Sequence, residues 1–248
     1  MEDRLMEVLR TESLKKYFGE VHAVDGVSIS VGDGEIISVV GPNGSGKTTL
    51  VNLISGGLKP DSGKVLFDGR DITNLTAHKR VKIGIGRSFQ IPAIYENLTT
   101  LDSVLVSIFS HEGISHIFYR TKDRFDKARE EAIKLLETLN IPIKLVSELP
   151  HGQRKLLDVA MALSLKPKLI LLDEPTAGIS LEERDEVMQT IVGFIEEQNI
   201  AAVIVEHDME VVGEYSDRIV VMHEGEVLKE GGKEILDDEE VRRILIGD

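Results

Sequence analysis

A glycine-rich segment near position 45 constrains the fold of this chain more than any other part of its sequence. An apolar, partly β-branched run, Ile36–Val40, precedes it, and such a run is typical of a buried strand. Residues 49–54 follow it and suit the start of a helix. The segment itself reads Gly41-Pro42-Asn43-Gly44-Ser45-Gly46-Lys47-Thr48. A strand, a loop with this glycine spacing, a Lys-Thr pair and a helix together form the pattern of a phosphate-binding loop.

The residue types in this loop fit the chemistry of phosphate binding. Glycines allow the backbone to wrap closely, so that its N–H groups point at phosphate oxygens. The N-terminus of a helix adds a favourable field for anions. The ammonium group of Lys47 can reach the terminal phosphates, and the hydroxyl of Thr48 can bind Mg²⁺. A plain glycine-rich turn into a helix is the alternative. We predict a nucleotide site formed by residues 41–48 together with Thr49.

The composition argues against several classes of protein. The chain of 248 residues carries a net charge of −14, whereas a broad nucleic-acid interface normally needs a basic face. It has no cysteine, which excludes disulfides and thiolate chemistry. It has no apolar run long enough to span a bilayer, and its first residues, MEDRLMEVLR, are too charged for a signal peptide. We therefore expect a soluble cytoplasmic protein that can sit on a membrane partner.

A second part of the predicted site lies much further along the chain. The apolar run 169–172 ends in Asp173 and Glu174. An acid at the end of a buried strand beside a phosphate loop can hold Mg²⁺, so Asp173 is the predicted metal partner. Glu174 can polarise an attacking water as general base. Alone, such a run is often only a strand that meets a polar loop; together with the phosphate loop it indicates a hydrolytic nucleotide site.

Two further polar residues are candidates for the same site. Gln90 precedes a helical stretch, and its amide oxygen can bind Mg²⁺ or the attacking water; the alternative is a solvated loop residue. His207 follows the strand-like run Ala201–Val205. An imidazole at the carboxyl end of a strand can donate to a γ-phosphate, although a lone histidine there is more often structural.

The order of the predicted elements indicates an α/β fold. In residues 8–30, short runs are separated by glycines, a pattern typical of short antiparallel strands. From about 92 to 165, apolar residues recur at helical spacing, and strand-like runs return at 169–172 and 201–205. Strands that alternate with helices imply a mostly parallel sheet with helices packed on it. The run 233–246 is predicted to be one polar amphipathic helix that lies in solvent.

Together these motifs resemble the ATP-binding subunit of an ABC transporter along nearly the full length of the chain. The matching pieces occur in the family's order: the phosphate loop, Gln90, Leu149-Pro150-His151-Gly152-Gln153, 169–174, 176–180 and His207. The resemblance implies one ABC-type nucleotide-binding domain over residues 1–248. It would have a phosphate-loop core sheet, an antiparallel β subdomain and an α-helical signature subdomain at about 92–165.

The resemblance also assigns roles to residues that the motifs alone leave open. The segment 149–153 matches the signature loop, normally Leu-Ser-Gly-Gly-Gln, which in the family binds the γ-phosphate of ATP held by the opposite subunit. This adds four residues to the nucleotide-contacting set: Pro150, His151, Gly152 and Gln153. Phe18 matches the aromatic that stacks on adenine, with a core aromatic as the alternative and Tyr17 as a rival. Residues 94–99 lie where family members contact membrane subunits.

Within the family, the segments 87–90 and 205–209 look like those of branched-chain amino-acid importers, and His151 also looks like the urea-import relatives. Two positions depart from the family pattern. Pro150 stands where the family usually has serine, and Ser180 stands where it usually has aspartate. Both departures lie in the half of the subunit that is presented to a partner, whereas the half that serves its own ATP is intact.

The resemblance implies an ATPase subunit of an ABC importer. Two such subunits would close head-to-tail around two Mg·ATP, and hydrolysis would reopen them to drive integral membrane permease subunits. An extracytoplasmic solute-binding protein would take part indirectly, and the chain would lie on the inner face of the cell membrane. One alternative is a non-transport ABC ATPase that acts on nucleic acid or translation, which the acidic charge disfavours. Another is an exporter or lipid-extraction ATPase with the same cassette. The partner ATPase can be a second copy or a different chain.

Overall fold

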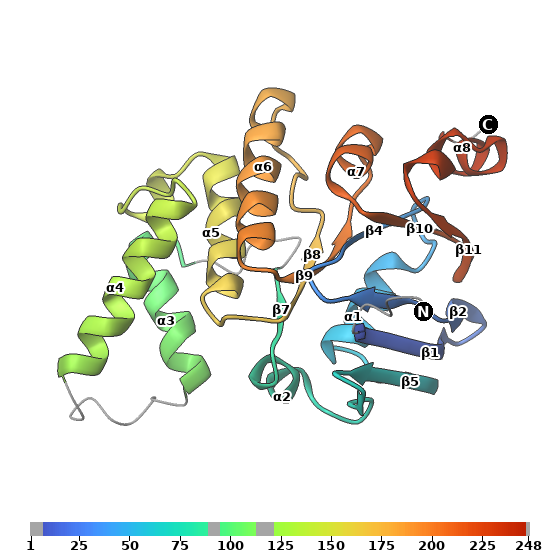
Figure 1. The fold of residues 1–248 in the computed structure, drawn as a ribbon, viewed down its shortest axis with the longest axis horizontal. Coiled ribbons are helices and arrows are strands. Elements are labelled where there is room, and N and C mark those ends of the chain that lie inside the picture. Colours follow the sequence, from blue (N-terminus) through green and yellow to red (C-terminus); the bar gives the residue numbers. More distant parts are fainter. Residues whose placement is uncertain (1–6, 89–94, 113–121, 247–248) are drawn as a thin grey trace, which may run out of the picture.

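Two β-sheets and helices packed around them make up the fold (Figure 1). A computed structural model describes residues 7–88, 95–112 and 122–246. Within these ranges, no helix is both long enough and apolar enough to cross a membrane.

The larger sheet has six strands in the order β11-β10-β4-β9-β8-β7. The strands are β4 Ile36–Val40, β7 Ile85–Arg87, β8 Leu169–Asp173, β9 Ala201–Val205, β10 Arg218–His223 and β11 Glu226–Gly231. All neighbours pair in parallel except β11, which runs antiparallel to β10. Every residue of β4, β8 and β9 is buried, as expected for parallel strands that are covered on both faces. The predicted mostly parallel sheet is confirmed.

The second sheet is antiparallel throughout and has the order β2-β1-β5-β6, with β3 paired to β1. The strands are β1 Glu7–Phe18, β2 Val21–Val27, β3 Ser30–Gly32, β5 Ser62–Phe67 and β6 Arg70–Asp71. Its apolar side chains join those of helix α1 (Lys47–Ser55) and of the larger sheet in one cluster, which includes Leu9, Leu50 and Val203. The helix that carries the phosphate loop therefore lies in a core built by both sheets. The predicted antiparallel layer is confirmed.

The remaining helices pack mainly against the larger sheet and one another. They are α2 Ala77–Lys82, α3 Thr100–Glu112, α4 Lys122–Thr138, the 3₁₀-helix η1 Val146–Glu148, α5 His151–Leu163, α6 Leu181–Glu197 and α7 Met209–Tyr215. In Figure 1, α3 and α4 lie at the end of the molecule away from the antiparallel strands, and α5 joins them to α6. Helices α3, α4 and α5 fall within the range of the predicted helical subdomain. Its proposed start at 92 lies outside the described residues, and the subdomain division stays a prediction.

The C-terminal segment differs from the single solvated helix expected from the sequence. It forms a 3₁₀-helix, η2 (Lys233–Asp237), and a separate helix, α8 (Glu239–Ile246). Asp238 divides them, because its side chain accepts hydrogen bonds from the backbone N–H groups of Glu240 at 3.0 Å and Val241 at 3.2 Å and so caps α8. Ile235 and Val241 are buried in a cluster with α7 and β10. The segment is therefore packed against the domain, and the expectation was wrong.

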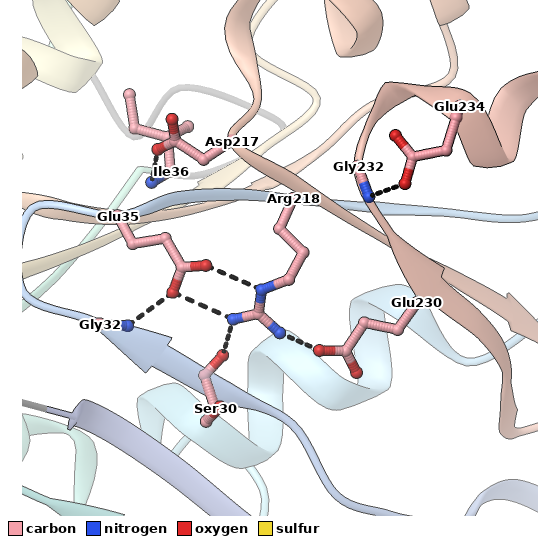
Figure 2. Close-up of polar contacts among 9 residues, drawn as sticks. All are labelled: Ser30, Gly32, Glu35, Ile36, Asp217, Arg218, Glu230, Gly232 and Glu234. Carbon is pink, nitrogen blue, oxygen red and sulfur yellow. Dashed lines mark hydrogen bonds and ion pairs between the residues drawn. The ribbon is translucent and has the colours of Figure 1, made fainter. Parts of the chain in front are cut away.

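A polar network joins the two sheets (Figure 2). The guanidinium of Arg218 on β10 donates to Glu35 at 2.7 and 3.0 Å, to the Ser30 carbonyl on β3 at 2.6 Å, and to Glu230 on β11. Glu35 also accepts from the backbone N–H of Gly32 at 2.6 Å. Burial opposes ionisation of Glu35, but the bonds from Arg218 and Gly32 outweigh it and lower the pKa of that carboxyl. The network fixes the antiparallel sheet to the edge of the core, away from the loop at 41–48.

Candidate nucleotide site

The carboxyl ends of three parallel strands meet at one edge of the larger sheet. The glycine-rich loop follows β4, Asp173 ends β8, and residues 206–208 follow β9. Strand β9 pairs with both β4 and β8, so the three loops lie side by side. Such an edge is where ligands bind in open α/β sheets. The structure thus brings together the phosphate loop, the acidic pair and His207, which the sequence places far apart.

The glycine-rich loop requires glycine at both of its ends. Gly41 has φ 151° and a Cβ there would lie 2.2 Å from the Met222 carbonyl oxygen. Gly46 has φ 104° and a Cβ there would lie 2.1 Å from the Ala23 carbonyl oxygen. No side chain fits either place, because the loop runs tightly between β10 and β2. Helix α1 begins at Lys47, so its free N–H groups face the loop.

Lys47 is buried within the loop that it serves. Its ammonium group donates to the carbonyl oxygens of Gly41 at 2.7 Å and Pro42 at 3.0 Å. Burial lowers the pKa of Lys47, and the carboxylates of Glu174 and Asp173 oppose that shift. The lysine is therefore a positive charge held between the loop and the acidic pair. Thr48 is exposed and Thr49 is half-buried in the first turn of α1.

Asp173 has the properties of a metal ligand. It is only 2% exposed, and its Oδ1 atom has no hydrogen-bond partner among the described residues. Its Oδ2 atom accepts from the Arg87 guanidinium at 3.4 Å. Burial raises the pKa of Asp173, and the charge of Arg87 opposes that shift. A buried carboxylate oxygen without a donor suits a hard divalent cation, so the residues present fit Mg²⁺.

Glu174 and His207 contact each other directly. The Nε2 atom of His207 lies 2.9 Å from Oε1 of Glu174. Glu174 has φ 51°, a left-handed conformation that costs energy for a residue with a Cβ, and its backbone N–H donates to the Val205 carbonyl at 2.9 Å. The side chain of Glu174 is 18% exposed and that of His207 is 43% exposed. The pair is therefore half-open to solvent beside the loop, where a water and a phosphate can reach it.

The sequence alone did not reveal the role of Arg87. Its guanidinium donates to Asn52 Oδ1 at 2.7 Å and to Ser55 Oγ at 3.0 Å, as well as to Asp173. Arg87 thus joins α1, the helix that follows the phosphate loop, to Asp173, the predicted metal ligand. The one sequence feature that pointed to Arg87 was its position shortly before Gln90. Gln90 itself lies outside the described residues.

Helix α5 begins within the segment 149–153, at His151. Pro150 is the N-cap residue of α5 and offers no side-chain hydrogen bond there. His151 is exposed, and its Nε2 atom lies 3.1 Å from where a Cβ on Gly178 would be. Gly152 is buried, and the Oε1 atom of Gln153 is buried with no partner among the described residues. The two segments that the sequence analysis placed toward a partner, 149–153 and 176–180, are therefore neighbours.

A family model described as ABC transporter matches residues 24–177. The chain belongs to that family. It is 37% identical to the probable branched-chain amino acid transport ATP-binding protein LivG of Methanocaldococcus jannaschii, over 98% of both chains. It is 31% identical to the high-affinity branched-chain amino acid transport ATP-binding protein BraF of Pseudomonas aeruginosa, over 97% of this chain and 98% of that one.

Solved ABC cassettes have the same fold. An ATP-binding cassette of an ABC transporter in its ADP conformation superposes with a TM-score of 0.86, at 36% identity, over 98% of this chain and all of that one. A bacterial ABC transporter cassette solved as a dimer superposes with a TM-score of 0.77, at 26% identity, over 91% of this chain and 98% of that one. The predicted ABC-type nucleotide-binding fold is confirmed.

The aromatic residues near the ABC phosphate loop differ in what they contact. The Tyr17 hydroxyl donates to Asp25 at 2.8 Å, and its ring stacks on His22 with 4.2 Å between centroids. Phe18 is 49% exposed, with the Lys16 ammonium 5.6 Å from the centre of its ring. Tyr17 is thus engaged through both its ring and its hydroxyl, whereas Phe18 is largely exposed.

Ser180 has a clear structural role in this ABC cassette. It is the N-cap residue of α6, and its hydroxyl accepts from the Glu183 backbone N–H at 3.3 Å. Serine and aspartate are both good N-caps, so the change from the family's usual aspartate keeps the start of α6. It removes one negative charge from the surface that the sequence analysis assigned to a partner.

Proposed function

We propose that this chain is the ATP-hydrolysing subunit of an ABC importer for branched-chain amino acids. One observation carries the proposal: the phosphate loop, Asp173 and the Glu174–His207 pair meet at one edge of the core sheet. The names of its full-length relatives LivG and BraF support the substrate class. Fold alone does not fix function in P-loop proteins, so the site residues bear the argument.

Nucleotide binding is assigned to the loop and to Phe18. Residues 41–49 would hold the β- and γ-phosphates through their backbone N–H groups, except Pro42, which has none. The Lys47 ammonium would give up its hydrogen bonds to the Gly41 and Pro42 carbonyls and donate to phosphate oxygens instead. The exposed ring of Phe18 would stack on the adenine ring. Thr48, Asp173 and Gln90 would hold Mg²⁺. When bound, the cation neutralises charge on the phosphates.

Hydrolysis is assigned to Glu174 and His207. Glu174 would take a proton from a water whose oxygen bonds to the γ-phosphorus, while the bond from that phosphorus to the β,γ-bridging oxygen breaks and ADP leaves. His207 orients the carboxylate of Glu174 through the 2.9 Å contact and can donate to a γ-phosphate oxygen. Most of the catalysis would come from positioning and charge, as is general for phosphoryl transfer.

The remaining half of the site would come from a second cassette. Residues Pro150 to Gln153 of one subunit would face the γ-phosphate of ATP held by the other, so hydrolysis requires two subunits that close head-to-tail. Opening and closing would drive membrane permease subunits from the cytoplasmic face, and a solute-binding protein would deliver the amino acid on the opposite face.

The test is to purify the complex that a tagged copy of this chain forms in its own cells. Integral membrane subunits are expected to co-purify and to support ATP-dependent uptake of radiolabelled leucine in proteoliposomes supplied with the solute-binding protein. Liposomes without ATP and liposomes given radiolabelled urea are the controls. A complex without membrane subunits, or one that takes up urea and not leucine, would contradict the proposal.

A further inference from the structure

Glu206 is a buried residue next to His207 in the sequence, and His207 contacts Glu174. Glu206 follows β9 and is only 3% exposed. Its Oε1 atom accepts from the backbone N–H of Thr176 at 3.0 Å and from the Thr176 hydroxyl at 2.7 Å. Its Oε2 atom accepts from the backbone N–H of His207 at 3.2 Å. Both oxygens of this buried carboxylate are thus bound by donors.

These bonds join two segments with different tasks in the proposed reaction. His207 is the residue in contact with Glu174. Thr176 begins the turn 176–180, which contains Gly178 beside His151 and ends at Ser180, the cap of α6. That turn and the segment of His151 form the surface assigned to the partner subunit. Glu206 is therefore the link between the histidine of a subunit's own site and the part of that subunit that faces its partner.

A second contact holds the segment of His207 to α6, the helix that follows the turn 176–180. Arg184 on α6 pairs with Asp208, whose side chain caps α7 by accepting from the backbone N–H groups of Glu210 at 2.9 Å and Val211 at 3.3 Å. The loop of His207 is thus held from both sides, by Glu206 and by Asp208. The side chain of Arg184 is 21% exposed, whereas Glu206 is only 3% exposed. Glu206 is the residue that accepts the His207 backbone N–H, so its removal would take away that acceptor while Asp208 stays in place.

We infer that Glu206 is a positioning residue for ATP hydrolysis, which holds His207 against Glu174 and couples its position to the turn 176–180. The inference rests on the proposed function, because it requires that Glu174 and His207 act on ATP. Glu206 touches neither the phosphate loop nor Asp173 in its hydrogen bonds; it acts through His207.

Glutamine is a sharp probe of this role because it has the shape of glutamate but only one acceptor oxygen. In Glu206→Gln, the amide –NH₂ must face either Thr176 or His207, and each offers a backbone N–H there. One backbone N–H loses its acceptor in either orientation, so the loop must shift. A misplacement of about 1 Å can cost roughly a hundredfold in rate. We expect kcat to fall about ten- to a hundredfold with the KM for ATP changed less than about twofold.

A double-mutant cycle separates positioning from a structural role. The kcat for ATP of the purified complex is measured for wild type, Glu206→Gln, His207→Ala and the double variant. Because Glu206 acts through His207, the Glu206→Gln change should have almost no further effect in the His207→Ala background. An equal fold-loss in both backgrounds would overturn the inference.

A second pair of variants keeps the test decisive if Glu206→Gln folds poorly. Thr176→Val removes the hydroxyl that donates to Glu206 but keeps the backbone N–H that donates to it, and we expect kcat to fall several-fold. Thr176→Ser keeps the hydroxyl, so its kcat should stay close to that of wild type. Equal rates for Thr176→Val and wild type would overturn the inference.

Glu35→Gln is the matched control. Glu35 is also a carboxylate that accepts from a backbone N–H and a side chain, but it lies at the sheet junction of Figure 2. The Glu35→Gln variant should have a lower melting temperature and an unchanged kcat. A loss of kcat like that of Glu206→Gln would overturn the inference. An inactive wild-type complex would overturn the proposed function and the inference with it. A Glu206→Gln complex with wild-type kcat would overturn the inference alone.

Discussion

The turn between β10 and β11 is expected to set the position of the phosphate loop. The Gly225 N–H donates to the Ser45 carbonyl in that loop at 3.1 Å, and the Gly225 carbonyl accepts from the Asp25 N–H on β2 at 2.8 Å. Gly225 has φ 85°, and a Cβ there would lie 2.5 Å from the His22 carbonyl oxygen. Gly225→Ala should therefore displace the turn and weaken nucleotide binding.

The turn at Asp68-Gly69 provides a matched control. Both turns place a residue with a Cβ at positive φ before a glycine: Asp68 at 47° before Gly69 at 72°, and Glu224 at 48° before Gly225 at 85°. A Cβ on Gly69 would meet nothing within 4 Å. Gly69→Ala should thus cost only the left-handed backbone strain of about 1–2 kcal/mol. The Asp68 backbone N–H donates to the Val8 carbonyl and its side chain pairs with Lys168, not with the phosphate loop, so we expect unchanged nucleotide affinity.

The magnitude for Gly225→Ala follows from the contacts. A Cβ at 2.5 Å must retreat by close to an ångström before it reaches ordinary contact with the His22 carbonyl, and this movement breaks the bond to Ser45. A hydrogen bond of this kind is worth about 0.5–1.5 kcal/mol. Because about 1.4 kcal/mol is a factor of ten in affinity, the Kd for ADP should rise about two- to twelvefold.

The assay is calorimetric titration with ADP, well below the melting temperature of all three proteins. The reasoning predicts that wild type and Gly69→Ala bind ADP equally and that Gly225→Ala binds it more weakly. Equal affinities for all three proteins would refute it. So would an equal loss in both variants, because backbone strain alone would then explain the effect.

Three further predictions concern the nucleotide. Lys47→Ala should remove most ATP affinity, measured by calorimetry, while the melting temperature changes little; unchanged affinity would remove the phosphate-loop assignment. Phe18→Ala should weaken adenine and guanine nucleotides alike, since stacking is worth about 1–3 kcal/mol for any base; a larger effect of Tyr17→Ala would show that the wrong aromatic was chosen. Pro150→Ser supplies a hydroxyl at the start of α5 and should raise steady-state ATPase several-fold, and an equal or lower rate would show that the proline is benign.

Local patterns predicted much of the fold. Ala201–Val205 is a strand over the residues expected, because a continuous apolar run of that length suits a fully buried parallel strand. The glycine loop and its helix were also predicted, since their conformations depend on residues close in sequence. The prediction of a single helix over 233–246 was wrong because Asp238 caps a new helix within an amphipathic run. The apolar residues keep a helical periodicity on both sides of Asp238, and this conceals the break.

The parts of the site that depend on distant partners could not be predicted. Arg87 and Asp173 are 86 positions apart, and Thr176 and Glu206 are 30 apart. Each of these residues looks like an ordinary polar residue in its own segment, and only the pairing of β7, β8 and β9 brings them together. A buried acceptor such as Glu206 is recognisable only when its donors are placed around it. The sequence motifs indicated groups that would contact nucleotide, but they gave no sign of the hydrogen bonds by which Arg87 and Glu206 join distant segments.

The most direct test of the ATPase assignment is the Glu174→Gln variant in the presence of Mg·ATP. The amide keeps the shape of the side chain but cannot accept the proton of the attacking water, and loss of a general base typically costs about 10²–10⁴ in rate. Phosphate release should fall at least about a hundredfold while Mg·ATP affinity stays at the wild-type value, and light scattering should show ATP-bound dimers accumulating. A variant that releases phosphate at the wild-type rate would contradict the assignment of Glu174 as the base.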